Sequence, residues 1–142
     1  MKLPGIHTIV TSILIHNHKV LILKRSNLVK TMKNQWAGIS GYLEKNEDLL
    51  TCAYREIFEE TGINKKNIAL IKNGNSILVD YPKDSLCFLV YPLLFESTTS
   101  NISLNWENSE YKWIKPIEII HYNTVPKLQE ILFTLIKNYN NI

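Results

Sequence analysis

One stretch constrains the fold of this 142-residue chain more than any other: Gly41 to Ile63, with the sequence GYLEKNEDLLTCAYREIFEETGI. Residues three and four positions apart are neighbours on a helix, so Glu56, Glu59 and Glu60 are expected to share one face. Apolar residues recur at the complementary spacing, at Leu50, Ala53, Tyr54, Ile57 and Phe58. The stretch therefore predicts an amphipathic helix whose apolar stripe is docked while its acids, rotated away from that stripe, face a cavity or solvent.

The crowding of these three acids calls for a physical reason. Like charges at helical spacing repel by a few tenths of a kcal/mol per pair, and a divalent cation would offset that cost. Carboxylate oxygens suit a hard ion such as Mg²⁺, and Mn²⁺ would fit the same ligands. The alternative is that the acids form a solvated face without a ligand, since charge runs usually lie on the surface.

The spacing of the fixed positions favours the first interpretation. The stretch matches G-x5-E-x7-R-E-U-x-E-E-x-G-U, where U is aliphatic, at Gly41, Glu47, Arg55 to Ile57, Glu59 to Glu60 and Gly62 to Ile63. This pattern resembles the signature of the Nudix, or MutT-like, hydrolases. The resemblance implies an α/β fold, the Nudix α-β-α sandwich with a mixed β-sheet between helices, formed by a single domain over residues 1–142 with the Nudix box at 41–63.

The resemblance also implies roles for residues of the box. Glu56, Glu59 and Glu60 would bind the metal ion, together with the backbone carbonyl of Ser40, the residue before the box glycine. Glu47 and Arg55 would orient these ligands without taking part in the chemistry. Many relatives carry Pro-Gly where this chain has Ile39-Ser40, which leaves Gly41 intact but changes the loop.

Candidate substrate contacts lie outside the box. Arg25, at the end of an expected strand, is either a charged strand end or a phosphate ligand, because a guanidinium matches phosphate geometry. Trp36 is either a core residue or a wall of the pocket. Tyr81 lies where a tyrosine marks some relatives that cleave dinucleoside polyphosphates. We therefore predict Arg25, Trp36 and Tyr81 as substrate-binding candidates.

A second acidic segment precedes the tryptophan at 113. In several Nudix relatives an acid on this loop binds a second metal or acts as general base, and Glu107 and Glu110 are the candidates here. Both could equally be surface acids. His16 and His18 could in principle bind metal, but a polar hairpin turn at 16–19 explains them as well.

The remaining elements follow from local patterns. Strands are expected over 6–15, 20–23, 77–81 and 86–95, with turns at 73–75 and 82–84. Near the C-terminus, Thr124 is expected to cap a helix with Pro126 in its first turn. That helix would carry an apolar stripe of Leu128, Ile131, Leu132, Leu135 and Ile136.

Composition excludes several other classes of protein. A hydrophobic fraction of 45% with 20% charged residues is typical of a globular domain, and no segment is long and apolar enough for a membrane span. The N-terminus lacks the pattern of a secretion signal, so we expect a cytoplasmic protein. The net charge of +3 comes from scattered basic residues, which does not indicate a nucleic-acid-binding surface. Cys52 and Cys87 lack a metal-type spacing and are expected to be inert thiols.

The expected function is Mg²⁺-dependent hydrolysis of a diphosphate bond in a nucleoside diphosphate linked to another group. Nucleoside triphosphates, dinucleoside polyphosphates and nucleotide sugars are candidate substrates, and Glu56, Glu107 and Glu110 are candidate general bases. One alternative is a Nudix-fold sensor that binds a nucleotide or metabolite without cleaving it. Another is a diphosphate isomerase, which would need a catalytic cysteine in a pocket. A homodimer is a further expectation, since dimers are common among Nudix relatives.

Overall fold

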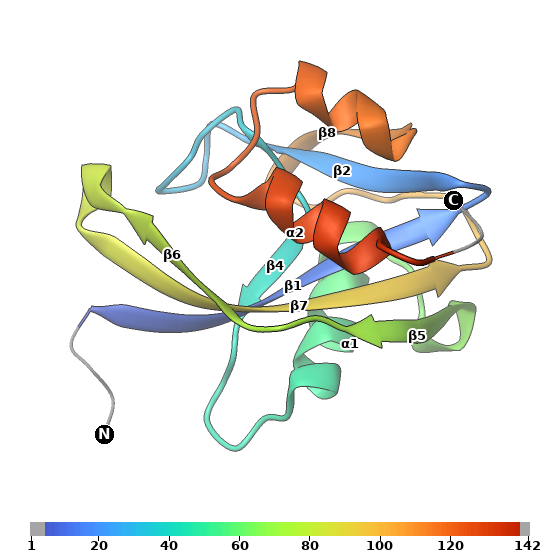
Figure 1. The fold of residues 1–142 in the computed structure, drawn as a ribbon, viewed down its shortest axis with the longest axis horizontal. Coiled ribbons are helices and arrows are strands. Elements are labelled where there is room, and N and C mark those ends of the chain that lie inside the picture. Colours follow the sequence, from blue (N-terminus) through green and yellow to red (C-terminus); the bar gives the residue numbers. More distant parts are fainter. Residues whose placement is uncertain (1–4, 140–142) are drawn as a thin grey trace.

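The fold is one mixed sheet with a helix on each face (Figure 1). The computed structural model describes residues 5–139. Its strands are β1 (Ile6–His16), β2 (Lys19–Arg25), β3 (Trp36–Ala37), β4 (Ile39–Tyr42), β5 (Ile68–Asn73), β6 (Ile77–Tyr81), β7 (Leu86–Ser97) and β8 (Asn108–Ile114). The α-helices are α1 (Leu49–Thr61) and α2 (Leu128–Ile136), and 3-10 turns span Lys65–Asn67, Pro82–Asp84 and Pro116–His121.

The central strand is β1. It runs parallel to β7 on one side and antiparallel to β2 and β4 on the other. β8 and β3 extend the sheet beyond β2, while β5 and β6 both pair with the long β7. β1 pairs with β2 near its carboxyl end and with β4 further back, and β4 leads through a loop into α1, which packs against β4 and β1.

Two separate cores lie on the two faces of the sheet. Alternate residues of a strand point to opposite faces, so Val10 and Leu14 pack in the cluster under α1 while Ile13 and Ile15 pack in the cluster under α2. Figure 1 shows α2 in front of the sheet and α1 behind it. The predicted sandwich of two helices around a mixed sheet is confirmed.

The strands expected over 6–15, 20–23, 77–81 and 86–95 are present, and the hairpin turn at 16–19 is confirmed as well. Asn17 and His18 both have left-handed backbone angles, with φ of 52° and 67°, as a two-residue hairpin turn requires. His16 Nδ1 lies 2.8 Å from the carbonyl oxygen of Ser97. β3, β4 and β5 had no sequence prediction.

The expected start of the C-terminal helix is wrong. α2 begins at Leu128, after Lys127 in the left-handed region with φ of 70°. The backbone just before it pairs with Trp36 instead, because Trp36 N–H donates to Asn123 O and Val125 N–H donates to Trp36 O, both at 2.9 Å. Strand-like pairing of this segment is incompatible with a helix starting at Thr124. The apolar stripe itself is confirmed, with Leu128, Ile131, Leu132 and Leu135 buried.

None of the helices in residues 5–139 has the length and apolar character needed to cross a bilayer.

Candidate active site

Helix α1 has a defined beginning and end. The Asp48 carboxylate accepts a hydrogen bond of 2.7 Å from Thr51 N–H, which satisfies one of the free donors of the first turn. At the other end Gly62 adopts φ of 76° and donates its N–H to Phe58 O at 2.9 Å. Capping hydrogen bonds therefore define both ends of α1, and the ends determine at which turns of the helix the acids lie.

The buried face of α1 differs from the prediction. Cys52, Ala53 and Ile57 are buried as core residues, but Phe58 is 55% exposed. Two of the acids, Glu56 and Glu60, are 8% and 4% exposed, so they lie beside the apolar stripe and not away from it. Glu59, whose side chain is 48% exposed, and Glu56, which lines the cavity described below, match the expectation that the acids face a cavity or solvent, whereas Glu60 is buried.

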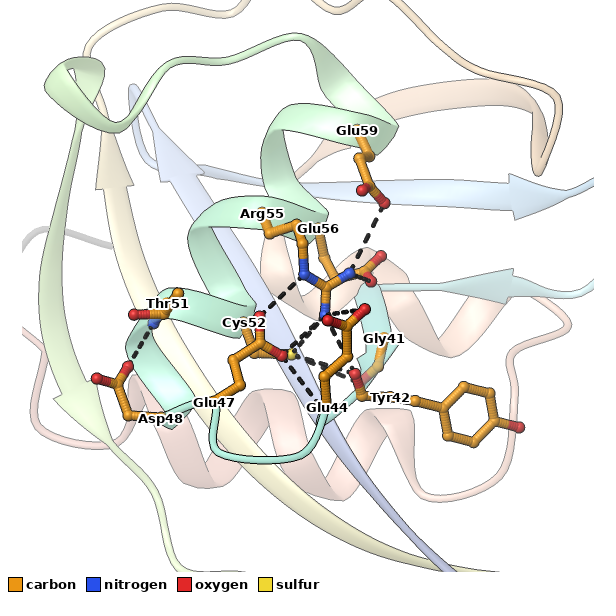
Figure 2. A network of polar contacts seen from close by, with 10 residues as sticks. All are labelled: Gly41, Tyr42, Glu44, Glu47, Asp48, Thr51, Cys52, Arg55, Glu56 and Glu59. Atoms are coloured by element: carbon orange, nitrogen blue, oxygen red, sulfur yellow. Dashed lines mark hydrogen bonds and ion pairs between the residues drawn. The ribbon is translucent and has the colours of Figure 1, made fainter.

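Arg55 joins the loop before α1 to the acids of the helix (Figure 2). Its Nε and Nη2 each donate to one oxygen of Glu47 at 2.9 Å, and Nη2 also donates to Tyr42 O at 3.2 Å. Its Nη1 lies 2.6 Å from Glu56 Oε1 and 3.9 Å from Glu59 Oε2. Hydrogen bonds from Arg55 lower the pKa of Glu47 to about 2, and Glu47 in turn raises the pKa of Arg55.

Glu56 lies directly against Gly41. A Cβ added at Gly41 would stand 2.1 Å from Glu56 Cδ, so a larger residue at position 41 would displace this carboxylate. Burial raises the pKa of Glu56; Arg55 opposes this effect and Glu59 adds to it. The box glycine therefore has a physical reason in this chain, which is the space occupied by the Glu56 side chain.

Glu60 is the most deeply buried acid of the helix. Its Oε1 accepts a hydrogen bond of 3.0 Å from the amide of Asn108, while its Oε2 is buried with no hydrogen-bond partner among residues 5–139. Burial raises the pKa of Glu60 well above its usual range, and the nearby Glu107 and Glu56 add to the rise. Asn108 was missed by the sequence analysis, because a lone asparagine carries no motif.

A cavity of about 350 Å³ opens beside these acids. Its polar part includes Arg25, Ser40, Glu56, Glu59 and Glu107. Its apolar part is formed by side chains of β1, β6, β7 and α2, among them Ile9, Val79, Phe88, Val90, Leu128 and Ile131. The cavity thus combines an acidic and cationic rim with an apolar interior.

The predicted substrate contacts separate into two groups. Arg25 and Tyr81 line the cavity, and so does Trp106, an aromatic residue outside that set whose side chain is 61% exposed. Trp36 does not line it: the ring is 8% exposed and packs edge-on against Tyr122, with ring centroids 5.3 Å apart. The placement of Trp36 fits the core alternative.

Arg25 is held by the loop that follows β2. Its Nε and Nη2 donate to the carbonyl oxygen of Thr31 at 3.1 and 2.9 Å. Burial lowers its pKa, opposed by the carboxylates of Glu60 and Glu107. The two bonds to Thr31 therefore hold the guanidinium at the cavity, near these carboxylates.

The two candidate acids of the 107–110 segment occupy different environments. Glu107 lines the cavity, where its backbone and side chain are fixed by Asn105: Glu107 N–H donates to Asn105 Oδ1 at 3.1 Å, and the Asn105 amide donates to Glu107 Oε1 at 3.3 Å. Glu110 is half exposed and forms an ion pair of 3.2 Å with Lys24 outside the cavity. Only Glu107 is brought to the acids of α1.

The residues present fit a divalent cation, although the three acids do not converge in advance. In residues 5–139 no three His, Cys, Asp or Glu side chains are grouped as a ready-made metal centre. Arg55 Nη1 instead forms ion pairs with both Glu56 and Glu59. The available donors are nevertheless carboxylate oxygens, which a hard cation prefers, and Glu60 Oε2 is buried without a hydrogen-bond partner in the described chain. Ser40 lies at the cavity too, its hydroxyl 2.8 Å from that of Thr11.

A comparison of the whole sequence with family models decides the assignment. The model described as "NUDIX domain" matches residues 6–135. The chain belongs to the Nudix family. The resemblance to the Nudix, or MutT-like, family drawn from residues 41–63 is confirmed.

Similar proteins agree with this assignment. The chain is 41% identical over 71 residues to an RNA pyrophosphohydrolase of Pelagibacter ubique, a match that spans 49% of this chain but only 42% of that relative. It is 27% identical over 124 residues to the nucleoside triphosphatase NudI of Escherichia coli, covering 82% and 86% of the two chains. The fold matches a MutT protein from Methanosarcina mazei Go1 with a TM-score of 0.77, at 19% identity and over 98% and 99% of the chains.

Proposed function

We propose that this Nudix protein hydrolyses a diphosphate bond in a nucleoside diphosphate derivative and depends on Mg²⁺ for this activity, with Mn²⁺ as a substitute. The observation that carries the proposal is the buried Glu60 with its unpartnered oxygen, next to Glu56 at the rim of a cavity with an apolar interior. A buried carboxylate with one oxygen left without a partner is costly in free energy, and binding a cation would offset that cost.

Glu56, Glu59, Glu60 and the Ser40 carbonyl would hold the metal ion. When bound, a divalent cation neutralises charge on phosphate oxygens and lowers the pKa of water. Movement of Arg55 away from Glu56 would accompany its binding, since both compete for the same carboxylate. Glu47 would hold Arg55 near the site by accepting its two hydrogen bonds.

The general base is Glu56 or Glu107. Both carboxylates line the cavity, within which a general base must reach the attacking water. The ion pair of Glu110 with Lys24, outside the cavity, speaks against a role for Glu110. Arg25 would donate to a phosphate group with the N–H donors that Thr31 does not use.

The apolar interior of the cavity would take the nucleoside, with Phe88, Tyr81 or Trp106 against the faces of the base. We favour a nucleoside triphosphate as substrate, because NudI, described as a nucleoside triphosphatase, matches along most of its length. The RNA pyrophosphohydrolase relative makes a 5′-triphosphate end of RNA the second candidate, although less than half of that protein is matched. Cytoplasmic location and a homodimeric state stay predictions from the sequence.

The test is a panel assay for released phosphate, pyrophosphate and nucleoside monophosphate. The panel contains the common nucleoside and deoxynucleoside triphosphates, an oxidised guanine nucleotide, a dinucleoside polyphosphate, a nucleotide sugar and a 5′-triphosphorylated RNA, each with Mg²⁺. Wild type is compared with Glu59→Gln and with Glu130→Gln, an exposed acid on α2 that pairs only with Lys127 in the contacts described here. Turnover by wild type and Glu130→Gln, and its loss in Glu59→Gln, supports the proposal.

Tight binding of a nucleotide without turnover in the same panel would overturn the hydrolase proposal in favour of a sensor. The isomerase alternative has no support in the site, because neither Cys52 nor Cys87 lines the cavity. Burial also raises the pKa of Cys52 to about 12, which keeps its thiol protonated near neutral pH.

A further inference from the structure

β8 contains an irregularity beside the site. The strand pairs antiparallel with β2, and the pairing is regular from Val20 opposite Ile114 to Lys24 opposite Glu110. The next residue of β2, Arg25, stands opposite Asn108, so Ser109 is passed over. This is a β-bulge, in which two residues of one strand oppose one residue of its partner.

The bulge decides to which face Asn108 points. Residues directly opposite each other on neighbouring strands share a face, as the 3.2 Å ion pair between Lys24 and Glu110 illustrates. In a regular ladder Ser109 would stand opposite Arg25, and Asn108 would point to the same face as Glu110. The extra residue turns Asn108 to the opposite face, where α1 packs and Glu60 lies.

The resulting contact is buried at both ends. Asn108 is 7% exposed, Glu60 is 4% exposed, and the amide nitrogen lies 3.0 Å from Glu60 Oε1. A buried carboxylate that accepts one neutral donor keeps a defined orientation, because rotation would break the bond without the replacement that water offers at a surface. Oε2 is the atom left without a partner.

The segment before Asn108 is anchored to β2. Ser26 N–H donates to Glu107 O and the Ser26 hydroxyl donates to Trp106 O, both at 2.8 Å. Asn108 N–H closes the turn on Asn105 O at 3.4 Å. The amide of Asn108 is therefore carried by a fixed backbone, which allows it to set the position of its neighbour.

We propose that Asn108 is a positioning residue for Glu60: its amide holds one carboxylate oxygen and thereby presents the other to the metal ion. This inference rests on the proposed function, since it assumes that Glu60 binds the cation. Partners that orient metal ligands in this way change metal affinity or activity by about 10- to 100-fold when they are removed.

The experiment measures Mn²⁺ binding directly, by electron paramagnetic resonance of the free ion, so that it does not depend on turnover. Asn108→Leu keeps the size of the side chain but removes the donor, and Asn108→Ser keeps a shorter donor. Asn101→Ala is the matched control, because Asn101 is exposed and its side chain forms no hydrogen bond with any of residues 5–139. Circular dichroism reports folding for every variant.

We expect Asn108→Leu to weaken Mn²⁺ binding about 10- to 100-fold, Asn108→Ser to recover part of the loss, and Asn101→Ala to bind like wild type. With the substrate identified by the panel, kcat is expected to fall more than KM rises, because Arg25 and the apolar interior are unchanged. If Asn108→Leu does not fold, the folded Asn108→Ser variant supplies the comparison.

Unchanged Mn²⁺ affinity in folded Asn108 variants, with reduced affinity in Glu60→Gln, would overturn the inference and leave a purely structural hydrogen bond. A lower unfolding temperature alone, without a change in Mn²⁺ affinity, would lead to the same conclusion. The proposed function fails by a different result, namely a wild-type protein that binds Mn²⁺ but hydrolyses no member of the panel.

Discussion

Glu47 and Glu60 belong to the same box and lie at opposite ends of α1, yet their surroundings are opposite in kind. Glu47 receives two hydrogen bonds from Arg55, which lower its pKa to about 2. Glu60 is buried with one neutral donor, near two other acids, and its pKa is raised well above the usual range. The fold therefore stabilises the ionised form of Glu47, whereas it makes the ionised form of Glu60 unfavourable.

This difference between Glu47 and Glu60 distinguishes an acid that stabilises the site from an acid that is available to bind a ligand. An acid whose charge is already compensated contributes to stability and has little to offer a cation. An acid that the fold leaves without compensation gains most when a cation binds. Substitution of these acids, and of the residues that contact them, tests this contrast.

Glu56→Gln and Glu60→Gln are expected to reduce kcat/KM by about 10²- to 10⁴-fold, the range for loss of a general base or of a major electrostatic contribution. A glutamine of the same shape removes the charge and leaves the packing. Steady-state kinetics on the best substrate of the panel measures the effect. Wild-type activity in either variant would contradict the assignment of these acids to the site.

Gly41→Ala is expected to reduce kcat/KM by about 10²-fold while the protein still folds. The added methyl group would overlap the end of the flexible Glu56 side chain, which moves at little cost in stability but leaves its position in the site. Gly74→Ala is the control, since its methyl group would meet Leu135 and Pro92 in the core at 2.9 Å. That variant should lose about 1–3 kcal/mol of stability and keep its activity, so equal loss of activity in both variants would count against the role of Gly41.

Without metal, Glu60→Gln is expected to unfold at a higher temperature than wild type at pH 7. Because the pKa of Glu60 is raised in the folded state, wild type has its full stability below the pKa of the unfolded chain, about 4.5, and loses stability as the pH rises through the higher folded-state value. The advantage of the variant should therefore disappear on acidification. Thermal unfolding in EDTA and in Mg²⁺ checks this, since Mg²⁺ should stabilise wild type and not the variant.

Glu47→Gln is expected to cost about 1–2 kcal/mol of stability at pH 7, because it removes charge-assisted hydrogen bonds to Arg55. The pKa of Glu47 is lowered, so this contribution is fully present above pH 4.5 and is lost as the pH falls toward 2. Glu44→Gln is the matched control: Glu44 is 67% exposed and 3.7 Å from the same guanidinium, so its loss should change stability by less than about 0.5 kcal/mol. Urea unfolding at several pH values measures both, and equal losses would refute the contrast.

Much of the site was accessible from the sequence because it is local. The helix and its three acids all lie within 23 consecutive residues, where helical spacing determines which side chains are neighbours. The apolar stripe of α2 was predicted for the same reason. The depth at which Glu56 and Glu60 lie was not, because burial depends on what packs against a helix and not on its own period.

The family and the identity of the acids on α1 were evident from the residue spacing in 41–63, and the sandwich of helices around a mixed sheet was implied by the resemblance to that family. The three-dimensional structure was needed to show which acid of the 107–110 segment reaches these acids, where α2 begins, and that Asn108 contacts Glu60. Each of these depends on pairing between strands far apart in the chain, and a shift of one residue in such pairing reverses the face to which every side chain points. The register of these strand pairs cannot be read from the residue pattern along the chain.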